Sequence, residues 1–282
     1  MSTRRDHSQA MGKRAGEVIF SQWMELERLR KAVLKKKTPE AIHDLRVASR
    51  RIRITLALFA PFIRDRFLKQ LTRKLRRFTR ELGRLRNIDE AIAYFAPYKD
   101  DLSELGAKLT SCRKRELKAV LQYLKQFPTS LVDQLCRLIV EDLSDNSQQN
   151  HLDATLPAYL SKLAVARFKP LHKLMLPAAD PDDADTRHEL RIAIKKWRYL
   201  LESMNQIFGH NYKEALDLLK EYQSILGRLN DMAEFAVLCG EMNLSDDIKT
   251  KVALLLKNDA AGYLERFLIM VESRRPHYTF YI

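Results

Sequence analysis

A segment that begins at His43 recurs 145 positions later in the chain, at His188. Residues 43–53 read HDLRVASRRIR and residues 188–198 read HELRIAIKKWR, so a histidine, an acid, a leucine, an arginine and a basic pair return in one order. A second pair of segments, LGRLRN at 82–87 and LGRLND at 226–231, returns at an offset of 144. Two motifs in the same order at nearly the same offset indicate that the chain holds two copies of one unit.

The first motif also predicts a surface. At about 100° per residue, a helix would place its histidine and its basic residues within an arc of roughly 80°, with the apolar residues opposite. Each copy would then pack by its apolar back and present a strip of cations in front. The first strip comprises His43, Arg46, Arg50 and Arg53, and the second comprises His188, Arg191, Lys195 and Arg198.

Few residues in the chain break helices, since it has 8 Gly and 9 Pro in 282 residues, and we find no sustained strand alternation. The sequence therefore predicts an all-α fold, made of two helical bundles at about 10–145 and about 151–282. A polar stretch at about 144–153 is the predicted linker. Expected helices are 10–36, 39–59, 64–97, 101–126 and 128–143 in the first bundle, and 155–175, 184–208, 212–240 and 246–273 in the second.

The expected helix at 64–97 carries a further set of cations. Its apolar stripe includes Leu71 and Leu85, and Gly83 would mark a close approach between helices. In the second bundle, Pro170 should interrupt the first helix. The cations opposite the stripe at 64–97 are Lys69, Arg73, Arg76 and Arg80.

The charge of the chain favours an anionic partner. Its formal net charge is +14 with a pI of about 9.7. The whole excess lies in residues 1–145, which hold 32 Lys plus Arg against 18 Asp plus Glu, while residues 146–282 hold 18 of each. Cations without carboxylates in the same arc repel one another unless solvent or an anion relieves them. Phosphate oxygens suit such a strip, because Arg, Lys and His all donate hydrogen bonds to them.

Other kinds of site find little support in the sequence. His43 and His188 each lack a second His or Cys at metal-ligand spacing, so we expect no metal site. The chain has no Gly-rich phosphate loop, no His-Glu-x-x-His motif and no nucleophile elbow, so we expect neither catalysis nor a cofactor. Three widely spaced cysteines argue against a disulfide framework and suit a reducing cytosol. Without an apolar stretch of about 18 residues we expect no membrane insertion and a cytoplasmic protein.

Nucleic acid is the main alternative partner, because phosphate contacts alone give non-specific binding. Against it, the sequence shows no zinc finger, helix-turn-helix or aromatic stacking platform. A phosphohydrolase is a weaker alternative, since no repeated carboxylate cluster could hold Mg²⁺.

Together, the duplicated His-x-x-Arg helix, its basic pair and the duplicated Leu-Gly segment resemble the CHAD family, the conserved histidine α-helical domain. The resemblance covers most of the chain from about residue 12. It implies two antiparallel four-helix-type bundles related by a pseudo-twofold axis, with a basic central channel that binds inorganic polyphosphate. A polyphosphate ligand would associate the protein with polyphosphate granules. Both strips would line the channel, and a further shell would comprise Lys69, Arg76, Lys213 and Lys220.

The chain departs from this pattern in two places. Asn87 stands where the family has Asp, whereas Asp231 keeps that residue in the second copy. Arg73 and Arg80 have Asp217 and Ser224 at their repeat positions, so the two halves of the channel would not be equivalent.

Overall fold

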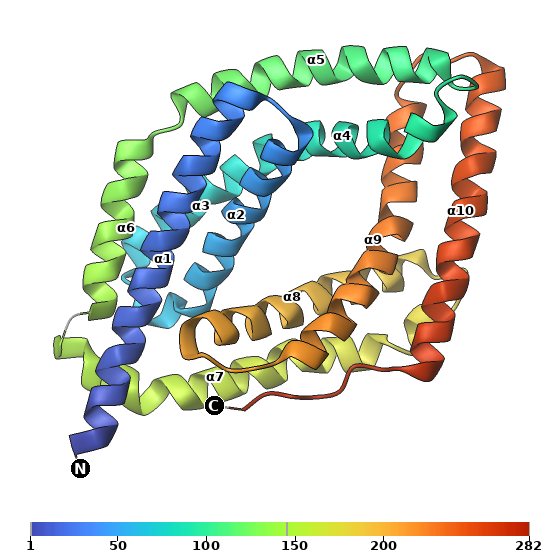
Figure 1. Cartoon of the computed structure of the whole chain (residues 1–282). Helices are drawn as coiled ribbons and strands as arrows, with labels where there is room; N and C mark the ends of the chain where they lie inside the picture. The colour runs from blue at the N-terminus through green and yellow to red at the C-terminus, as the bar shows by residue number, and fades with distance from the viewer. Residues whose placement is uncertain (1, 145, 282) are drawn as a thin grey trace. The chain divides into compact units, whose positions relative to one another are not determined.

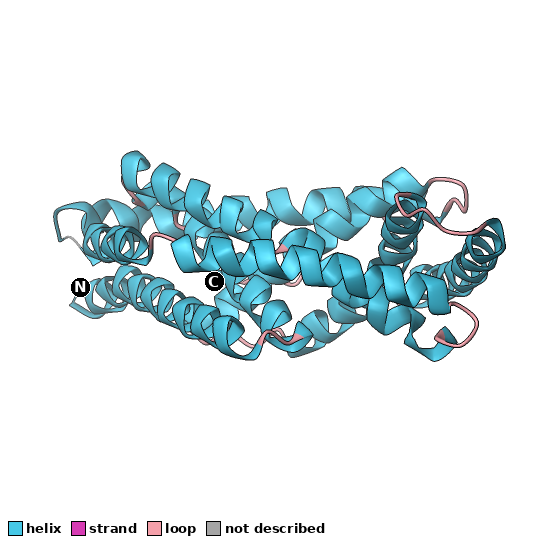
Figure 2. Cartoon of the chain, turned by 90° about the horizontal axis from the view of Figure 1, so that it is seen from above, coloured by secondary structure: helices cyan, strands magenta, loops and turns pink. Residues whose placement is uncertain are grey.

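The structure, a computed structural model, describes residues 2–144 and 146–281, with side chains at 12–144 and 155–281. All regular secondary structure in these residues is helical, as Figures 1 and 2 show. The predicted all-α fold class is confirmed. None of the helices in the described ranges is long and apolar enough to cross a lipid bilayer.

The chain divides into two compact units. The first unit comprises Met1–Lys99 and Gly106–Leu156, and the second comprises Asp100–Leu105 and Pro157–Ile282. The division falls inside helix α7 (Asn146–Leu174), so the stretch predicted as a linker is helical from Asn146 onward. Asp145 lies outside the described residues. That the two units are copies of one ancestral repeat remains a prediction.

In the first unit, α1 (Ser2–Lys36), α2 (Pro39–Leu58), α3 (Asp65–Glu81) and α6 (Thr129–Ser144) form a bundle in which each helix packs on two others (Figure 1). The apolar spacing along α1 explains this packing, because Ile19, Leu26 and Val33 are fully buried. The unit also contains α4 (Gly83–Phe95) and most of α5 (Ser103–Gln126). Helix α4 packs on α2 and α3.

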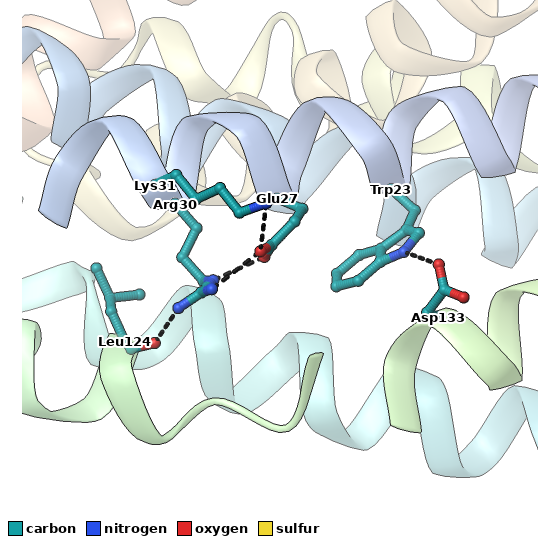
Figure 3. Close-up of polar contacts among 6 residues, drawn as sticks. All are labelled: Trp23, Glu27, Arg30, Lys31, Leu124 and Asp133. Atoms are coloured by element: carbon teal, nitrogen blue, oxygen red, sulfur yellow. Dashed lines mark hydrogen bonds and ion pairs between the residues drawn. The ribbon is translucent and has the colours of Figure 1, made fainter. Parts of the chain in front are cut away.

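Polar contacts fix α1 against the end of α5 and the start of α6 (Figure 3). The indole Nε1 of Trp23 donates to Oδ1 of Asp133 at 3.0 Å, and the guanidinium of Arg30 donates to the carbonyl of Leu124 at 2.6 Å. Glu27 accepts from Arg30 at 2.7 Å, which partly neutralises a guanidinium that is mostly buried. These bonds satisfy polar groups that burial would otherwise leave without water.

Helix α2 begins where its sequence predicts. Thr38 has extended backbone and its hydroxyl accepts from the N–H of Ala41 at 3.3 Å, while Pro39 occupies the first helical position. Such a cap replaces a partner that the first turn of a helix lacks. This cap fixes the start of α2 about one turn before His43, the first residue of the cation strip.

The prediction of one continuous helix at 64–97 is wrong, because the chain forms two helices there, α3 and α4, with a break at Leu82. The carbonyl of Thr79, in the last turn of α3, accepts from Nη1 of Arg46 at 3.1 Å. A side chain of α2 thus satisfies a carbonyl at a helix end, where intrahelical donors run out. The apolar stripe alone did not reveal the break, since Phe78 before it, Leu82 at it and Leu85 after it are all fully buried.

The second unit contains most of α7, together with α8 (Ala184–Phe208), α9 (Lys213–Gly240) and α10 (Asp246–Ser273). The last three helices lie close to the predicted ranges, whereas α7 begins at Asn146 and so starts well before the expected 155. Helix α9 packs on both α8 and α10. Asp183 caps α8 by accepting from the N–H of Thr186 at 2.9 Å, and Gly209 ends that helix at φ 71°, where a residue with a Cβ would be strained.

The expected interruption at Pro170 is wrong, because α7 continues through Pro157 and Pro170 to Leu174. A proline removes one intrahelical hydrogen bond. Leu160 and Leu171 on this helix are nevertheless buried, so the loss is offset by packing of the apolar face on either side of Pro170.

An extended segment after α10 covers the back of α8. The ring of Tyr278 stacks on Trp197 with centroids 5.7 Å apart, and Phe168 of α7 meets Trp197 edge-on at 5.3 Å. Trp197 is fully buried as a result. With its back held by these rings, α8 presents its cation strip on the other side.

Candidate anion-binding site

The first cation strip lies on α2, as predicted. His43 is exposed, whereas Arg46, Arg50 and Arg53 are half-buried. The opposite side of the helix packs into the bundle, and the apolar residues on that side are all buried, as the helical spacing predicts. These are Leu45, Ala48, Ile52, Leu56 and Phe59.

Within the first unit the two duplicated motifs come together. Arg46 bonds the carbonyl of Thr79, and a Cβ built on Gly83 would lie 3.6 Å from its Nη1, an ordinary contact. A Cβ on Gly227 would meet nothing within 4 Å. The prediction that Gly83 marks a close approach between helices is therefore wrong. The space beside Gly227 is open, and Gly83 has room for a Cβ beside the guanidinium of Arg46.

His43 has a lowered pKa. The first cause is the partial loss of hydration where neighbouring residues cover the otherwise exposed ring, and the second is the positive charge of Arg86, a residue of the second motif. Arg86 itself pairs with Glu90 one turn further along α4. Sequence reasoning assigned no role to Arg86, although its place in a duplicated motif was a usable signal.

Arg53 stands at the centre of a cluster of like charges. Burial lowers its pKa, and the charges of Arg76 and Arg50 lower it further. Its Nε is buried and makes no hydrogen bond with any described residue. A guanidinium held in this way loses hydration without gaining a carboxylate partner. An anion bound beside Arg53 would reduce the repulsion from the neighbouring arginines and accept a hydrogen bond from its Nε.

The exposed side of α3 extends this cluster. Arg73, Arg76 and Arg80 are exposed, and none of the three forms an ion pair with a described side chain. We call them the arginine face. Lys69 differs, because Asp65 one turn earlier on the same helix pairs with it at 2.6 Å. The first unit thus holds Arg53 on α2 and the arginine face on α3, two packed helices, with no ion pair between these arginines and a described carboxylate.

The second cation strip lies on α8, and the apolar residues behind it are buried. These are Leu190, Ala193, Trp197 and Leu201. Here polar partners surround the strip. Oδ1 of Asn230 accepts from Nη1 of Arg191 at 3.2 Å and lies 3.1 Å from Nδ1 of His188. Sequence reasoning missed Asn230, which belongs to the second copy of the Leu-Gly motif.

The far end of the second strip is also partly compensated. The guanidinium of Arg198 lies 4.9 Å from the ring centroid of Tyr199, and its Nε is 3.7 Å from Oε1 of Glu202. That distance is too long for a hydrogen bond, and the Nε of Arg198 is buried without one, as is that of Arg53 at the same repeat position. Lys195 lies half-buried between the two ends.

Helix α9 carries no counterpart of the arginine face. Lys213 and Lys220 are exposed, but Asp217 pairs with Lys220 at 2.8 Å and has a pKa lowered by that hydrogen bond. Glu221 pairs with Arg274 at 2.6 Å. The departure predicted at the repeat positions is therefore an electrostatic one, because Asp217 neutralises Lys220, whereas Arg76 at the same repeat position forms no ion pair with a described side chain.

Metal-ligating and thiol side chains at 12–144 and 155–281 are scattered. No group of three or more His, Cys, Asp and Glu there could hold a metal ion. Cys136 and Cys239 are buried, and burial raises the pKa of their thiols to about 12 and about 11. Cys112 is half-buried on α5.

Solved structures of similar fold are known. The crystal structure of the CHAD domain from the plant Ricinus communis aligns with a TM-score of 0.68 at 22% identity, covering 94% of this chain and 93% of that one. PptA from Streptomyces chartreusis aligns with a TM-score of 0.65 at 16% identity, covering 94% of this chain and 99% of that one. No curated protein matches significantly. A family model of the CHAD domain matches residues 17–239, most of the chain. By this match the chain belongs to the CHAD family.

Proposed function

We propose that this protein binds inorganic polyphosphate, or another phosphate-rich polyanion, and does not transform it. The observation that carries the proposal is the set of arginines on α2 and α3. Arg53 is half-buried with a buried Nε that lacks an acceptor, and the arginine face beside it has no ion pair with a described carboxylate. A flexible chain with about one negative charge per phosphate offers acceptors at close intervals to such a surface.

The duplicated strips favour a linear ligand over a single phosphate ion. Each strip presents several hydrogen-bond donors along one face of a helix. A polyanion that binds several of these donors loses its translational freedom only once, whereas separate phosphate ions would each lose it. That one polyphosphate chain contacts both strips, in a channel as the resemblance implies, belongs to this proposal. Residence in the cytoplasm and at polyphosphate granules belongs to it too.

A competition experiment tests the ligand class. We expect polyphosphate to displace a fluorescent single-stranded oligonucleotide from the protein at low concentration, and the oligonucleotide to displace labelled polyphosphate poorly at the same salt. Salt must be matched because both polyanions release counterions on binding. Equal or reversed competition would favour a nucleic-acid-binding protein instead.

The absence of catalysis is a second expected result. No described carboxylate cluster could position a divalent metal for attack on a phosphoanhydride. Polyphosphate incubated with the protein and Mg²⁺ or Mn²⁺ should keep its length on a gel. Phosphate release that follows the purified protein through fractionation, and that disappears in a carboxylate variant, would assign an enzyme.

The lowered pKa of His43 gives a pH prediction. In the free protein this pKa lies below the ordinary 6.5, because of the partial loss of hydration and the charge of Arg86. Bound phosphate would favour the imidazolium, so polyphosphate should raise the pKa of His43. The affinity for polyphosphate should then increase as the pH falls from the pKa of His43 in the complex to its pKa in the free protein. Histidine NMR titration with and without polyphosphate measures this, with exposed His277 as the control. An unmoved His43 would remove it from the site.

A further inference from the structure

The contacts of Asn230 determine which nitrogen of His188 carries a proton. A guanidinium can only donate hydrogen bonds, so the Asn230 atom that faces Arg191 at 3.2 Å must be the amide oxygen. The same oxygen lies 3.1 Å from Nδ1 of His188. An amide oxygen can only accept, and its two lone pairs match these two donors. Nδ1 of His188 therefore bears the hydrogen.

This assignment decides what the histidine can offer a ligand. A neutral imidazole carries one hydrogen, so with Nδ1 protonated its Nε2 holds a lone pair. Ionised phosphate oxygens also present lone pairs, and two acceptors repel each other. His188 can donate from Nε2 to phosphate only as an imidazolium, with a second proton taken from solvent.

The first unit lacks this arrangement. The repeat position of Asn230 is Arg86, whose guanidinium has no acceptor for an imidazole N–H. No hydrogen bond to the ring of His43 is found among the residues that the structure describes. The ring of His43 is therefore not held in one tautomer, and it can donate from Nε2 while neutral.

We propose that Asn230 is a positioning residue that holds His188 in its Nδ1–H tautomer and so makes phosphate contact by this histidine conditional on proton uptake. This inference rests on the proposed function for its ligand, but the tautomer itself is a property of the free protein. No covalent bond changes, and the proton comes from the buffer.

Charged groups around the pair set how readily that proton binds. Helix α9 packs on α8, as does η3 (Pro177–Ala179), which carries no charged residue. Arginines within a turn of the pair oppose the imidazolium and carboxylates favour it. These groups are Asp185, Arg187, Glu189 and Arg191 on α8, and Arg228, Asp231 and Glu234 on α9.

The tautomer is tested by NMR without any ligand. In protein with ¹⁵N-labelled histidine above about pH 8, where imidazole is neutral, two-bond proton–nitrogen spectra distinguish the two tautomers. We expect the Nδ1–H pattern for His188 in wild type and Asn230→Asp, and a shift toward Nε2–H in Asn230→Ala. Asn258→Ala, at an exposed position on α10, is the matched control. An Nε2–H pattern in wild type, or no change in Asn230→Ala, would overturn the assignment.

Calorimetry with polyphosphate in buffers of different ionisation enthalpy then measures proton uptake on binding. A charged hydrogen bond gained at low pH should raise wild-type affinity about tenfold between pH 8 and pH 6. In Asn230→Ala, both the number of protons taken up on binding and the pH dependence of the affinity should fall toward the values for His188→Gln. Asn230→Asp should restore both quantities. His43 contributes alike to all these variants. Binding with uptake unchanged by Asn230→Ala contradicts this inference alone, whereas no binding by wild type contradicts the proposed function.

Discussion

Reversing Arg73 and Arg76 to Glu is expected to lower the affinity for polyphosphate by about a hundredfold at 0.1 M salt. Each cation that contacts a phosphate releases about 0.7 of a counterion from a single-stranded polyanion, which corresponds to about fivefold in affinity at this salt. Losing two such contacts costs about 25-fold, and the added repulsion of two carboxylates increases the loss. Both arginines are exposed and form no ion pair with a described side chain, so the reversal disrupts no bridge within the protein.

The matched control reverses Lys213 and Lys220 on α9. Lys220 already pairs with Asp217 at 2.8 Å, so the second unit has less free positive charge to lose. We expect this control to lose less than about tenfold in affinity. The slope of log affinity against log salt concentration should become shallower by about 1.4 when Arg73 and Arg76 are reversed, and by less than that in the control. Affinity is measured by titration over a salt series, with circular dichroism confirming the fold. Equal losses would place the arginine face outside the site.

Arg113→Met is expected to lower the free energy of unfolding by about 3–5 kcal/mol. Nε of Arg113 donates to Oδ1 of Asp89 at 2.6 Å, and the carboxylate side chain is fully buried. The same guanidinium donates to the carbonyl of Lys37 at 3.2 Å, so it links α5 to α4 and to the turn before α2. Without Arg113 a charged carboxylate would stay buried with neither of its oxygens paired, since Oδ2 already has no partner.

The pH dependence identifies the cause. Burial already raises the pKa of Asp89 despite Arg113. A carboxyl whose folded pKa exceeds the unfolded one destabilises the charged native state, so stability is regained as pH falls through the folded value. Arg113→Met should therefore recover part of its loss in acid. Asp89→Asn should change stability by less than about 1 kcal/mol, because its amide oxygen still accepts from Arg113. Urea unfolding at several pH values measures these effects.

Arg115→Met on the same helix is the control for Arg113→Met. Arg115 is exposed, and its guanidinium lies 3.9 Å from Glu116, too far for a hydrogen bond. Exposed pairs of this kind contribute about 0–1 kcal/mol. If both variants lose the same stability, the buried carboxylate is not the cause.

The sequence predicted the fold class and the faces of the helices well, because both depend on local periodicity. Ile52 and Trp197 occupy one repeat position, and both are buried behind their strips as the spacing requires. The start of α2 at Pro39 was equally readable, since Thr38 caps it through atoms only three residues away. Such features need no knowledge of what the helix packs against.

Helix continuity was harder to predict, because the outcome depended on contacts from other helices. A proline usually ends a helix, yet α7 passes through Pro170. A run of good helix formers usually continues, yet the chain breaks at Leu82, where Arg46 from another helix takes the carbonyl of Thr79. In both places tertiary packing outweighed local propensity.

The sequence by itself determined which residues share each cation strip, because helical geometry fixes that arrangement. Only the tertiary structure decided the electrostatic state of each strip. Asn230 meets His188 and Arg191 across two helices, Arg86 lowers the pKa of His43, and Arg53 is desolvated beside Arg76. Charge, hydrogen bonding and desolvation depend on distances of a few ångström between segments far apart in the chain, and packing alone sets these distances.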